Sequence, residues 1–212
     1  MGAIDPERKS VHATERLILR EMVTDDAPFL NTLLNEPGWI EHIGDRGVRT
    51  DEDAARYAAE GPIRSYREHG FGLYTVVTRE NNRPIGICGL VAREGLDVPD
   101  LGFAFLASAT GRGYASEAGR VVLEHAHARR GLVRPPAVAS PATPASLRAL
   151  DRLGSTRIGA PPLRPTGDAS CLIAPRRGAR AAPPRRPLAA PAPPALTHPR
   201  PPPARPRSAG AE

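Results

Sequence analysis

The sequence predicts an α/β domain with a mixed, mostly antiparallel sheet flanked by helices, followed by a disordered C-terminal tail. Helical patterns come early in the chain. Three strand-like segments with short connections follow them, which is typical of an antiparallel meander. Strands and helices then alternate, which favours a mixed sheet in an α/β fold. The end of the chain changes composition sharply, and this change predicts the tail.

The first third of the chain is predicted to begin with a strand and a helix. Residues 15–22 form the strand, because Leu17 and Leu19 alternate with charged neighbours. A short helix begins at Thr24 and stops at Pro37, where we expect a loop.

The next helical region begins at a capping-box pattern, in which Thr50 is followed three residues later by Asp53. We expect Gly61-Pro62 to break this helix, because proline lacks the N–H that a helix interior needs. A second helical turn then ends at Gly70, which suits the left-handed conformation of a helix C-terminus.

The meander is predicted from three segments that read as strands, residues 72–78, 85–91 and 100–106. A turn over residues 81–84 joins the first two into a hairpin. The third segment alternates in polarity, which places three apolar side chains on one face: Leu101, Phe103 and Phe105.

The second half of the domain alternates helices with short strands. A long helix follows Ala115, and a strand over 132–138 is shortened by Pro135-Pro136, because proline cannot donate to a sheet ladder. A helix over 146–153 ends at Gly154. Two closing strands are expected after it, over 156–158 and 170–173.

Composition divides the chain after residue 174. Residues 175–212 hold twelve of the 25 prolines and eight arginines against one acid, so the net charge of +6 belongs to this segment. With almost no apolar surface to bury, it cannot offset the entropy of ordering. We predict a flexible N-terminus over 1–13, a folded domain over 14–174 and a disordered tail over 175–212. The tail composition fits a frame-shifted reading of GC-rich DNA as well as a genuine basic tail.

Several functional classes are excluded by composition. Cys88 and Cys171 are too few for a disulfide scaffold, and neither has a metal-ligand partner at close spacing, so no metal site is expected. No apolar run approaches the ~18 residues of a membrane span, and residues 1–10 lack the apolar stretch of a secretory signal. We expect a cytoplasmic protein without a membrane contact. The tail has no aromatic residue to stack on bases, so it would bind nucleic acid only non-specifically.

A glycine loop between a strand and a helix carries the main chemical signal. Gly111 and Gly113 let the chain turn sharply, so that several backbone N–H groups can point at one anion, and the helix N-terminus adds to them. A tight strand–helix turn with no ligand is the plain alternative. A P-loop would need a lysine here, and a dinucleotide fingerprint would need a third glycine where Ser116 stands.

At this point the chain resembles the GNAT superfamily of N-acetyltransferases, and it looks closest to the branch that acetylates the N-termini of ribosomal proteins. The resemblance covers residues 14 to 155 and rests on five motifs in order: 14–20, 84–90, 100–106, 111–118 and 145–154. It implies a GNAT-like fold with acetyl-CoA as the acyl donor. It also implies a primary amine as the acceptor and a monomer or homodimer.

The resemblance assigns the cofactor-binding residues. It implies that a backbone N–H of Phe105 or Leu106 polarises the thioester carbonyl. It implies that the phosphates of the cofactor are bound by the loop and the start of the helix, which comprise Gly111, Arg112, Gly113, Tyr114 and Ala115. Thr143 stands where the family usually has an Asn that contacts the cofactor, and Leu150 where many relatives have a Tyr that acts as general acid.

The reaction needs a base and an acid. A neutral amine attacks the thioester directly, so an ammonium must first lose a proton, usually to a carboxylate. Asp100 is the candidate base, against the alternative of a solvated charge at a strand end. Ser146 is the candidate proton donor to the leaving thiolate; the alternative is a hydroxyl at the start of a helix with no catalytic role. Trp39, His42 and Arg46 are candidates for the rim of the substrate cleft, with Trp39 otherwise in the core.

The sequence therefore predicts an acetyl-CoA-dependent N-acetyltransferase that acts on a primary amine of a protein N-terminus or a small molecule. A degenerate acyl-CoA-binding protein without turnover is the first alternative. A protein that binds nucleic acid through its tail is the second.

Overall fold

The computed structural model describes residues 10–132, 135–139, 143–159 and 171–175. The strands are β1 (Ser10–Ala13), β2 (Leu17–Arg20), β3 (Leu73–Thr78), β4 (Pro84–Val91), β5 (Asp100–Phe105), β6 (Ala137–Ala139), β7 (Ser155–Gly159) and β8 (Cys171–Pro175). They form one eight-stranded sheet in the order β1-β2-β3-β4-β5-β6-β8-β7. Among these described strands, β5 and β6 pair in parallel and the other neighbours pair antiparallel. The predicted mixed, mostly antiparallel sheet is confirmed.

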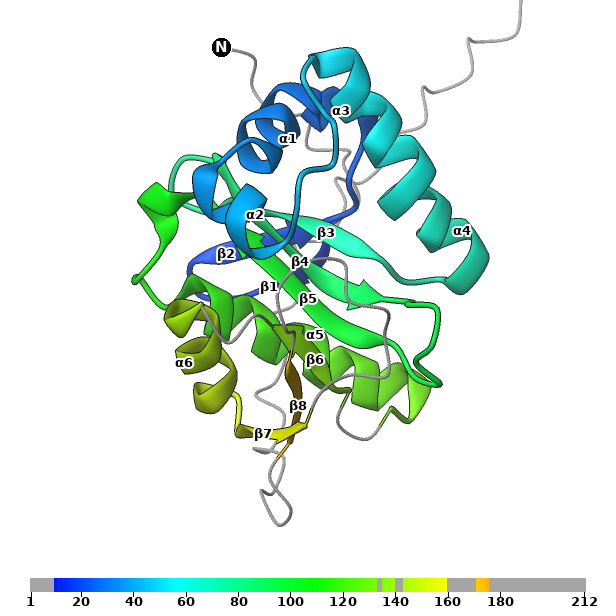
Figure 1. The fold of residues 1–212 in the computed structure, drawn as a ribbon, viewed down its shortest axis with the longest axis vertical. Helices are drawn as coiled ribbons and strands as arrows, with labels where there is room; N and C mark the ends of the chain where they lie inside the picture. Colours follow the sequence, from blue (N-terminus) through cyan, green and yellow to red (C-terminus); the bar gives the residue numbers. More distant parts are fainter. Residues whose placement is uncertain (1–9, 133–134, 140–142, 160–170, 176–212) are drawn as a thin grey trace, which may run out of the picture.

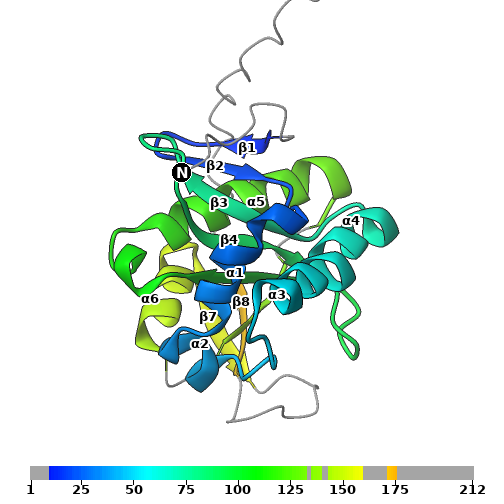
Figure 2. The same cartoon turned by 90° about the horizontal axis from the view of Figure 1, so that it is seen from above.

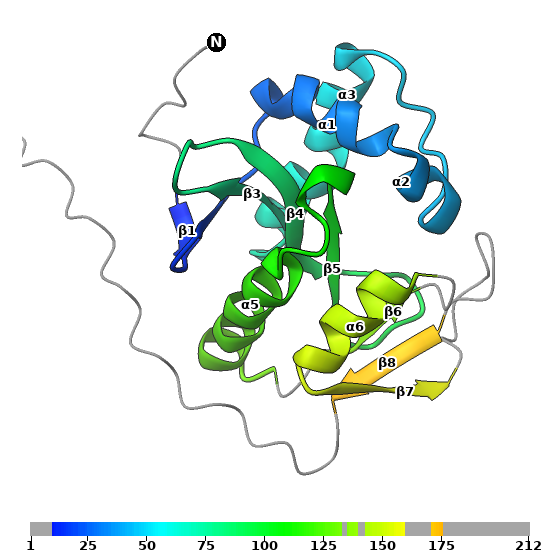
Figure 3. The same ribbon diagram turned by 90° about the vertical axis from the view of Figure 1, so that its left-hand side faces the viewer.

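Helices cover both faces of this sheet (Figure 1). They are α1 (Ala27–Leu34), α2 (Pro37–His42), α3 (Asp51–Ala58), α4 (Arg64–His69), α5 (Tyr114–Arg130) and α6 (Pro144–Arg152). The first four lie on one face, and α5 and α6 lie on the other. The side view in Figure 3 also shows α1–α3 on the face opposite α5 and α6. None of the helices in the described ranges is long and apolar enough to cross a membrane.

Two apolar cores separate the layers. The core between the sheet and α5–α6 contains Leu17, Leu19, Val76, Cys88, Leu101, Val122 and Leu150, with Phe103 and Phe105 packed against it. The core between the sheet and α1–α3 contains Met22, Leu30, Leu33, Leu34, Trp39, Ile87 and Leu106, with Ala104 packed against it. The alternation predicted for β5 is therefore confirmed, since Leu101, Phe103 and Phe105 share one face.

The N-terminal boundary differs from the expected one. Residues 10–13 were expected to be flexible, but β1 pairs with β2 and extends the sheet (Figure 2). The side chain of His12 explains this, because it is only 8% exposed and its ring lies against the rings of Tyr74 and His125. Residues 1–9 lie outside the described residues, so their predicted flexibility stays a prediction.

Two prolines act differently from what we expected. Pro37 begins α2 instead of ending a helix in a loop, because the first helical position needs no N–H donor. Pro62 does not break the second helical region: α3 continues through a π-helical segment, Ala59–Ile63, into α4. A π-helical turn spaces its hydrogen bonds more widely, which accommodates the missing proline N–H.

The helix ends around these prolines were predicted correctly. The Thr50 side chain accepts a hydrogen bond from the Asp53 N–H at 3.2 Å, and Gly70 ends α4 with a φ of 69°. At the C-terminal side, β7 and β8 are the two closing strands. Pro175 is the last residue of β8, and residues 176–212 lie outside the described part of the chain, so the disordered tail also stays a prediction.

Candidate functional site

The parallel contact between β5 and β6, which we call the seam, has one paired position among the described residues. Among the described residues, Leu101 and Ala137 are the single paired position, and the Leu101 N–H donates to the Pro136 carbonyl at 2.7 Å. On its other edge, β5 pairs with β4 along all six of its residues. Within the described residues, no register position with β6 follows Leu101 along this edge of β5.

The direction of the β5 amides follows from one hydrogen bond. The Leu106 N–H donates to the Ile85 carbonyl at 3.0 Å, toward β4. Because successive amides of a strand point to opposite edges, the N–H of Phe105 points toward the seam. Of the two amides considered for the thioester carbonyl, that of Leu106 is thus already bonded within the sheet. The amide of Phe105 is the one directed at the seam.

The glycine loop leads from β5 into the N-terminus of α5. Gly111 and Gly113 both have a φ of 82°, in the left-handed region that favours glycine, and Gly113 is the N-cap of α5. The first helical bond runs from the Glu117 N–H to the Gly113 carbonyl at 3.1 Å. The N–H groups of the residues between them have no partner inside the helix. With the helix dipole, these amides suit an anion.

Arg16, in the turn between β1 and β2, makes hydrogen bonds to this loop and to the first turn of α5. Its Nη1 donates to the Arg112 carbonyl at 3.1 Å and its Nε to Glu117 Oε2 at 2.8 Å. Its guanidinium lies 4.7 Å from the centre of the Tyr114 ring, and that of Arg112 lies 5.9 Å from it. Burial opposes ionisation of Glu117, but hydrogen bonds from Thr14 and Arg16 outweigh it and lower the pKa. Sequence reasoning missed Arg16, because in a charged, alternating strand nothing distinguishes it from a solvated residue.

The other predicted residues of the acyl-donor side lie on α6. Thr143 is the N-cap of α6, and its side chain makes no capping hydrogen bond. Ser146 is half-buried in the first turn. Leu150 is 2% exposed and belongs to the core, so an apolar side chain is well accommodated there. The Ser116 hydroxyl donates to the Ala149 carbonyl at 3.4 Å, which joins α5 to α6.

Asp100 lies at the start of β5 and is completely buried. Its Oδ1 accepts a hydrogen bond from Arg93 Nε at 2.8 Å, whereas its Oδ2 has no partner among the described residues. Burial raises the pKa of Asp100 above its usual value, in spite of the Arg93 charge. Phe105 lies five residue steps further along the strand, a distance of about 16 Å. The structure thus does not bring Asp100 close to the Phe105 amide.

Glu36 is a carboxylate that sequence reasoning did not single out. It precedes α2 and is half-buried, and its Oε2 accepts a hydrogen bond from the Ala107 N–H at 3.0 Å. This bond joins the start of α2 to the segment just after β5, across 71 residues of chain. No local pattern marks such a contact, because the two partners meet only in the folded domain.

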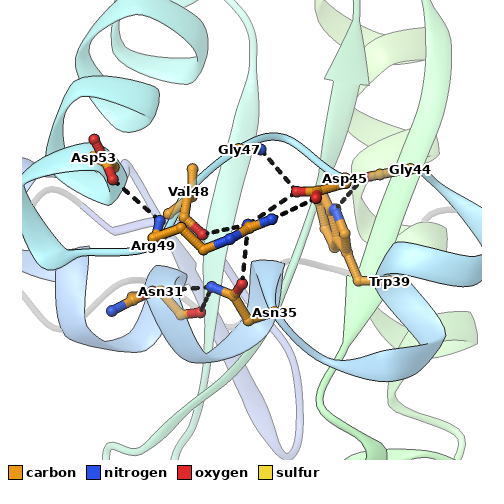
Figure 4. Close-up of polar contacts among 9 residues, drawn as sticks. All are labelled: Asn31, Asn35, Trp39, Gly44, Asp45, Gly47, Val48, Arg49 and Asp53. Atoms are coloured by element: carbon orange, nitrogen blue, oxygen red, sulfur yellow. Dashed lines mark hydrogen bonds and ion pairs between the residues drawn. The ribbon is translucent and has the colours of Figure 1, made fainter.

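The connection between α2 and α3 is held by a polar network (Figure 4). The Arg49 guanidinium binds both carboxylate oxygens of Asp45 and donates to Asn35 Oδ1 at 3.4 Å. The hydrogen bonds that Asp45 accepts from Arg49 and from the Gly47 N–H lower the pKa of its carboxyl group to about 2. Trp39 Nε1 donates to the Gly44 carbonyl at 3.1 Å.

The predicted rim residues fall into different environments. Trp39 is 6% exposed and belongs to the core, His42 is half-buried and Arg46 is exposed. Within the described ranges, no three His, Cys, Asp or Glu side chains are grouped so that they could hold a metal ion.

Comparison with known proteins identifies relatives of this arrangement. A family model described as an acetyltransferase (GNAT) domain matches residues 16–156. The uncharacterised N-acetyltransferase YnaD of Bacillus subtilis (strain 168) is 25% identical over 146 residues, 69% of this chain and 82% of that protein. A putative GNAT-family acetyltransferase from Bordetella pertussis is 22% identical with a TM-score of 0.66, over 80% of this chain and 100% of that one.

The fold is also shared with an enzyme solved together with coenzyme A. RimL, a ribosomal L7/L12 α-N-protein acetyltransferase, is 16% identical with a TM-score of 0.66. The alignment covers 78% of this chain and 96% of that one.

Proposed function

Since the chain belongs to the GNAT family of acetyltransferases, we propose that it transfers an acetyl group from acetyl-CoA to a primary amine. The observation that carries the proposal is the seam between β5 and β6, which opens beside the glycine loop. It combines an N–H directed outward from Phe105 with the group of amides at the start of α5. A thioester and a pyrophosphate are the two features of acetyl-CoA that need such donors.

Each part of the site has a distinct task in this proposal. The Phe105 amide polarises the thioester carbonyl. Gly111, Gly113 and the first amides of α5 hold the pyrophosphate, and Arg112 contributes a positive charge. Arg16 keeps the loop in place through its bond to the Arg112 carbonyl at 3.1 Å.

In this proposal, side chains around the seam carry out the proton transfers. Acetyl-CoA supplies an activated acyl group, and the protein must supply a neutral amine. An α-amine, with a pKa of about 8, loses its proton more easily at neutral pH than a lysine side chain, with a pKa of about 10.4. Carboxylates stand near both ends of β5, namely Asp100 at its start and Glu36 beyond its end. Ser146, in the first turn of α6, is the candidate that protonates the leaving thiolate.

The experiment that tests the proposal measures thiol release. The protein is incubated with acetyl-CoA and a panel of amines: a peptide with an unblocked N-terminus, spermidine, an aminoglycoside and free amino acids. We expect thiol to be released only when one class of amine is present. Binding of acetyl-CoA without release in any arm would favour the acyl-CoA-binding alternative, for which the apolar Leu150 gives a reason. We further propose a cytoplasmic monomer or homodimer.

A further inference from the structure

We propose that Glu36 is the general base that deprotonates the acceptor amine; this inference rests on the proposed acetyl transfer. The residue lies where α1 ends and α2 begins, on the face of the sheet that these helices cover. At that end of β5, the side chains of Ala104 and Leu106 pack into the core beneath α1–α3. An amine that approaches the seam from this face therefore meets the segment that carries Glu36.

The distances favour Glu36 over Asp100. Leu106 has an extended backbone, with a φ of −54° and a ψ of 144°, so the amides of Phe105 and Ala107 are about 7 Å apart. Glu36 Oε2 lies 3.0 Å from the Ala107 nitrogen, so it is within about 10 Å of the Phe105 nitrogen. Asp100, at about 16 Å along the strand, is too far from that amide for a direct transfer.

The distance at which a base would have to lie from the Phe105 amide matches the position of Glu36. A carbonyl oxygen held by the Phe105 amide lies about 3 Å from its nitrogen. The attacking amine then stands about 3 Å from the carbonyl carbon. A carboxylate within about 10 Å of that amide can contact the amine directly or through one water. The second carboxylate oxygen of Glu36 makes no hydrogen bond to another described residue, so it can accept a proton while Oε2 stays bonded to the Ala107 N–H.

The proton balance of the step is simple. The acceptor ammonium gives one proton to Glu36, and the nitrogen lone pair forms the C–N bond as the C–S bond breaks. The second proton lost by the nitrogen reaches the departing thiolate, with Ser146 as its donor. Glu36 then releases its proton to water. The sum is an amide, a thiol and one proton.

The test is the substitution Glu36→Gln, because glutamine can still accept the hydrogen bond from the Ala107 N–H but cannot act as a base. With acetyl-CoA and a short peptide as acceptor, we expect kcat at pH 7 to fall at least tenfold, with an unchanged KM for acetyl-CoA. The deficit should shrink to under threefold near pH 9.5, where the α-amine is already neutral. If another amine of the panel is the acceptor, its own pKa sets the upper pH.

Matched variants separate the possible outcomes. Glu41→Gln makes the same change on an exposed residue of α2 and should behave as wild type at every pH. A Glu36→Gln rate within twofold of wild type, or a deficit that does not change with pH, would overturn the proposal. The same pH-dependent deficit in Asp100→Asn instead would also overturn it. Wild-type protein that acetylates no amine would overturn the proposed function itself, and the role of Glu36 with it.

Discussion

At the scale of single residues, His12 is an ionisable group that the fold holds in its neutral form. Burial, and to a lesser degree the nearby His125, lower its pKa from 6.5 to about 4. The unfolded chain therefore binds a proton between these two pH values that the folded domain does not bind. The stability associated with neutral His12 is complete above about pH 6.5 and is lost as the pH falls toward 4.

We predict that acidification from pH 7 to pH 4 lowers the free energy of unfolding by up to about 3 kcal/mol through His12 alone. Urea unfolding at a series of pH values measures it. The variant His12→Gln should show a shallower pH dependence, whereas the control His127→Gln, at an exposed site on α5, should keep the wild-type slope. Equal slopes in all three proteins would show that His12 does not carry the effect.

Gly113 is the residue on which the phosphate assignment depends. Its φ of 82° disfavours a side chain, and an added carboxylate would repel a pyrophosphate at the same amides. We predict that Gly113→Asp loses the thermal stabilisation by acetyl-CoA. At a hundred times its Kd, this ligand contributes about 2.7 kcal/mol, a Tm shift of about 5–10 °C in wild type.

The control for this variant is Gly131→Asp, which places the same side chain at the other end of α5. Gly131 has a comparable φ of 62°, so the backbone strain is similar, but no phosphate is expected there. Its shift with acetyl-CoA should remain full. A full Tm shift with acetyl-CoA in Gly113→Asp would mean that the loop does not bind the phosphates. No Tm shift in the wild-type protein would refute acetyl-CoA binding.

At the scale of elements, a buried ion pair joins β2, the helical turn Thr24–Asp26 before α1, and β3. Arg20 and Asp26 are 3% and 4% exposed, and two hydrogen bonds of 2.7 and 2.6 Å connect them. Thr75 donates to the same carboxylate at 2.9 Å. Burial opposes ionisation of Asp26, but its bonds with Arg20 outweigh that and lower the pKa.

Removal of one partner should leave a buried charge without compensation. We predict that Asp26→Ala lowers the free energy of unfolding by about 3–5 kcal/mol. Arg56→Met, which breaks the exposed pair with Asp53, should lower the free energy of unfolding far less, because solvent screens an exposed ion pair. Urea unfolding compares the two. Similar losses in both variants would contradict a special role for burial.

The elements that the sequence predicted well are those fixed by local chemistry. The capping box at Thr50, the glycine end of α4 and the alternation in β5 depend on neighbouring residues, and all three are confirmed. Pro37 and Pro62 were interpreted wrongly, because proline can begin a helix, as Pro37 does, and a π-helical turn can accommodate it, as at Pro62. Only the surrounding packing decides between them.

The candidate site, like the elements, could be predicted only where its residues are close together in the sequence. The glycine loop is contiguous in the sequence, and the structure gives both glycines the backbone conformation that it needs. Glu36 and Arg16 contact Ala107 and Arg112, which lie 71 and 96 residues away along the chain. No spacing rule connects such partners. The order of the strands and helices has to be known before these contacts can be inferred.

At the scale of the whole molecule, the motifs of the site all precede the tail. We predict that deletion of residues 176–212 changes the affinity for acetyl-CoA by less than about twofold, or roughly 0.4 kcal/mol. The deletion begins after Pro175, because β8 ends there. Titration calorimetry on the full chain and the shortened chain measures the difference. A tenfold loss would show that the tail contributes to the site.

In the part of the chain that the structure describes, Leu101 and Ala137 are the one paired position between a block of five strands, β1–β5, and a block of three, β6, β8 and β7. Few of the described backbone bonds have to break for one block to open while the other stays closed, so we expect each block to have its own opening free energy. Amide hydrogens of β6 and β8 should therefore exchange with deuterium earlier than those of β3 and β4. A ligand that spans the seam would slow this exchange in both blocks at once, so that binding would turn two cooperative units into one.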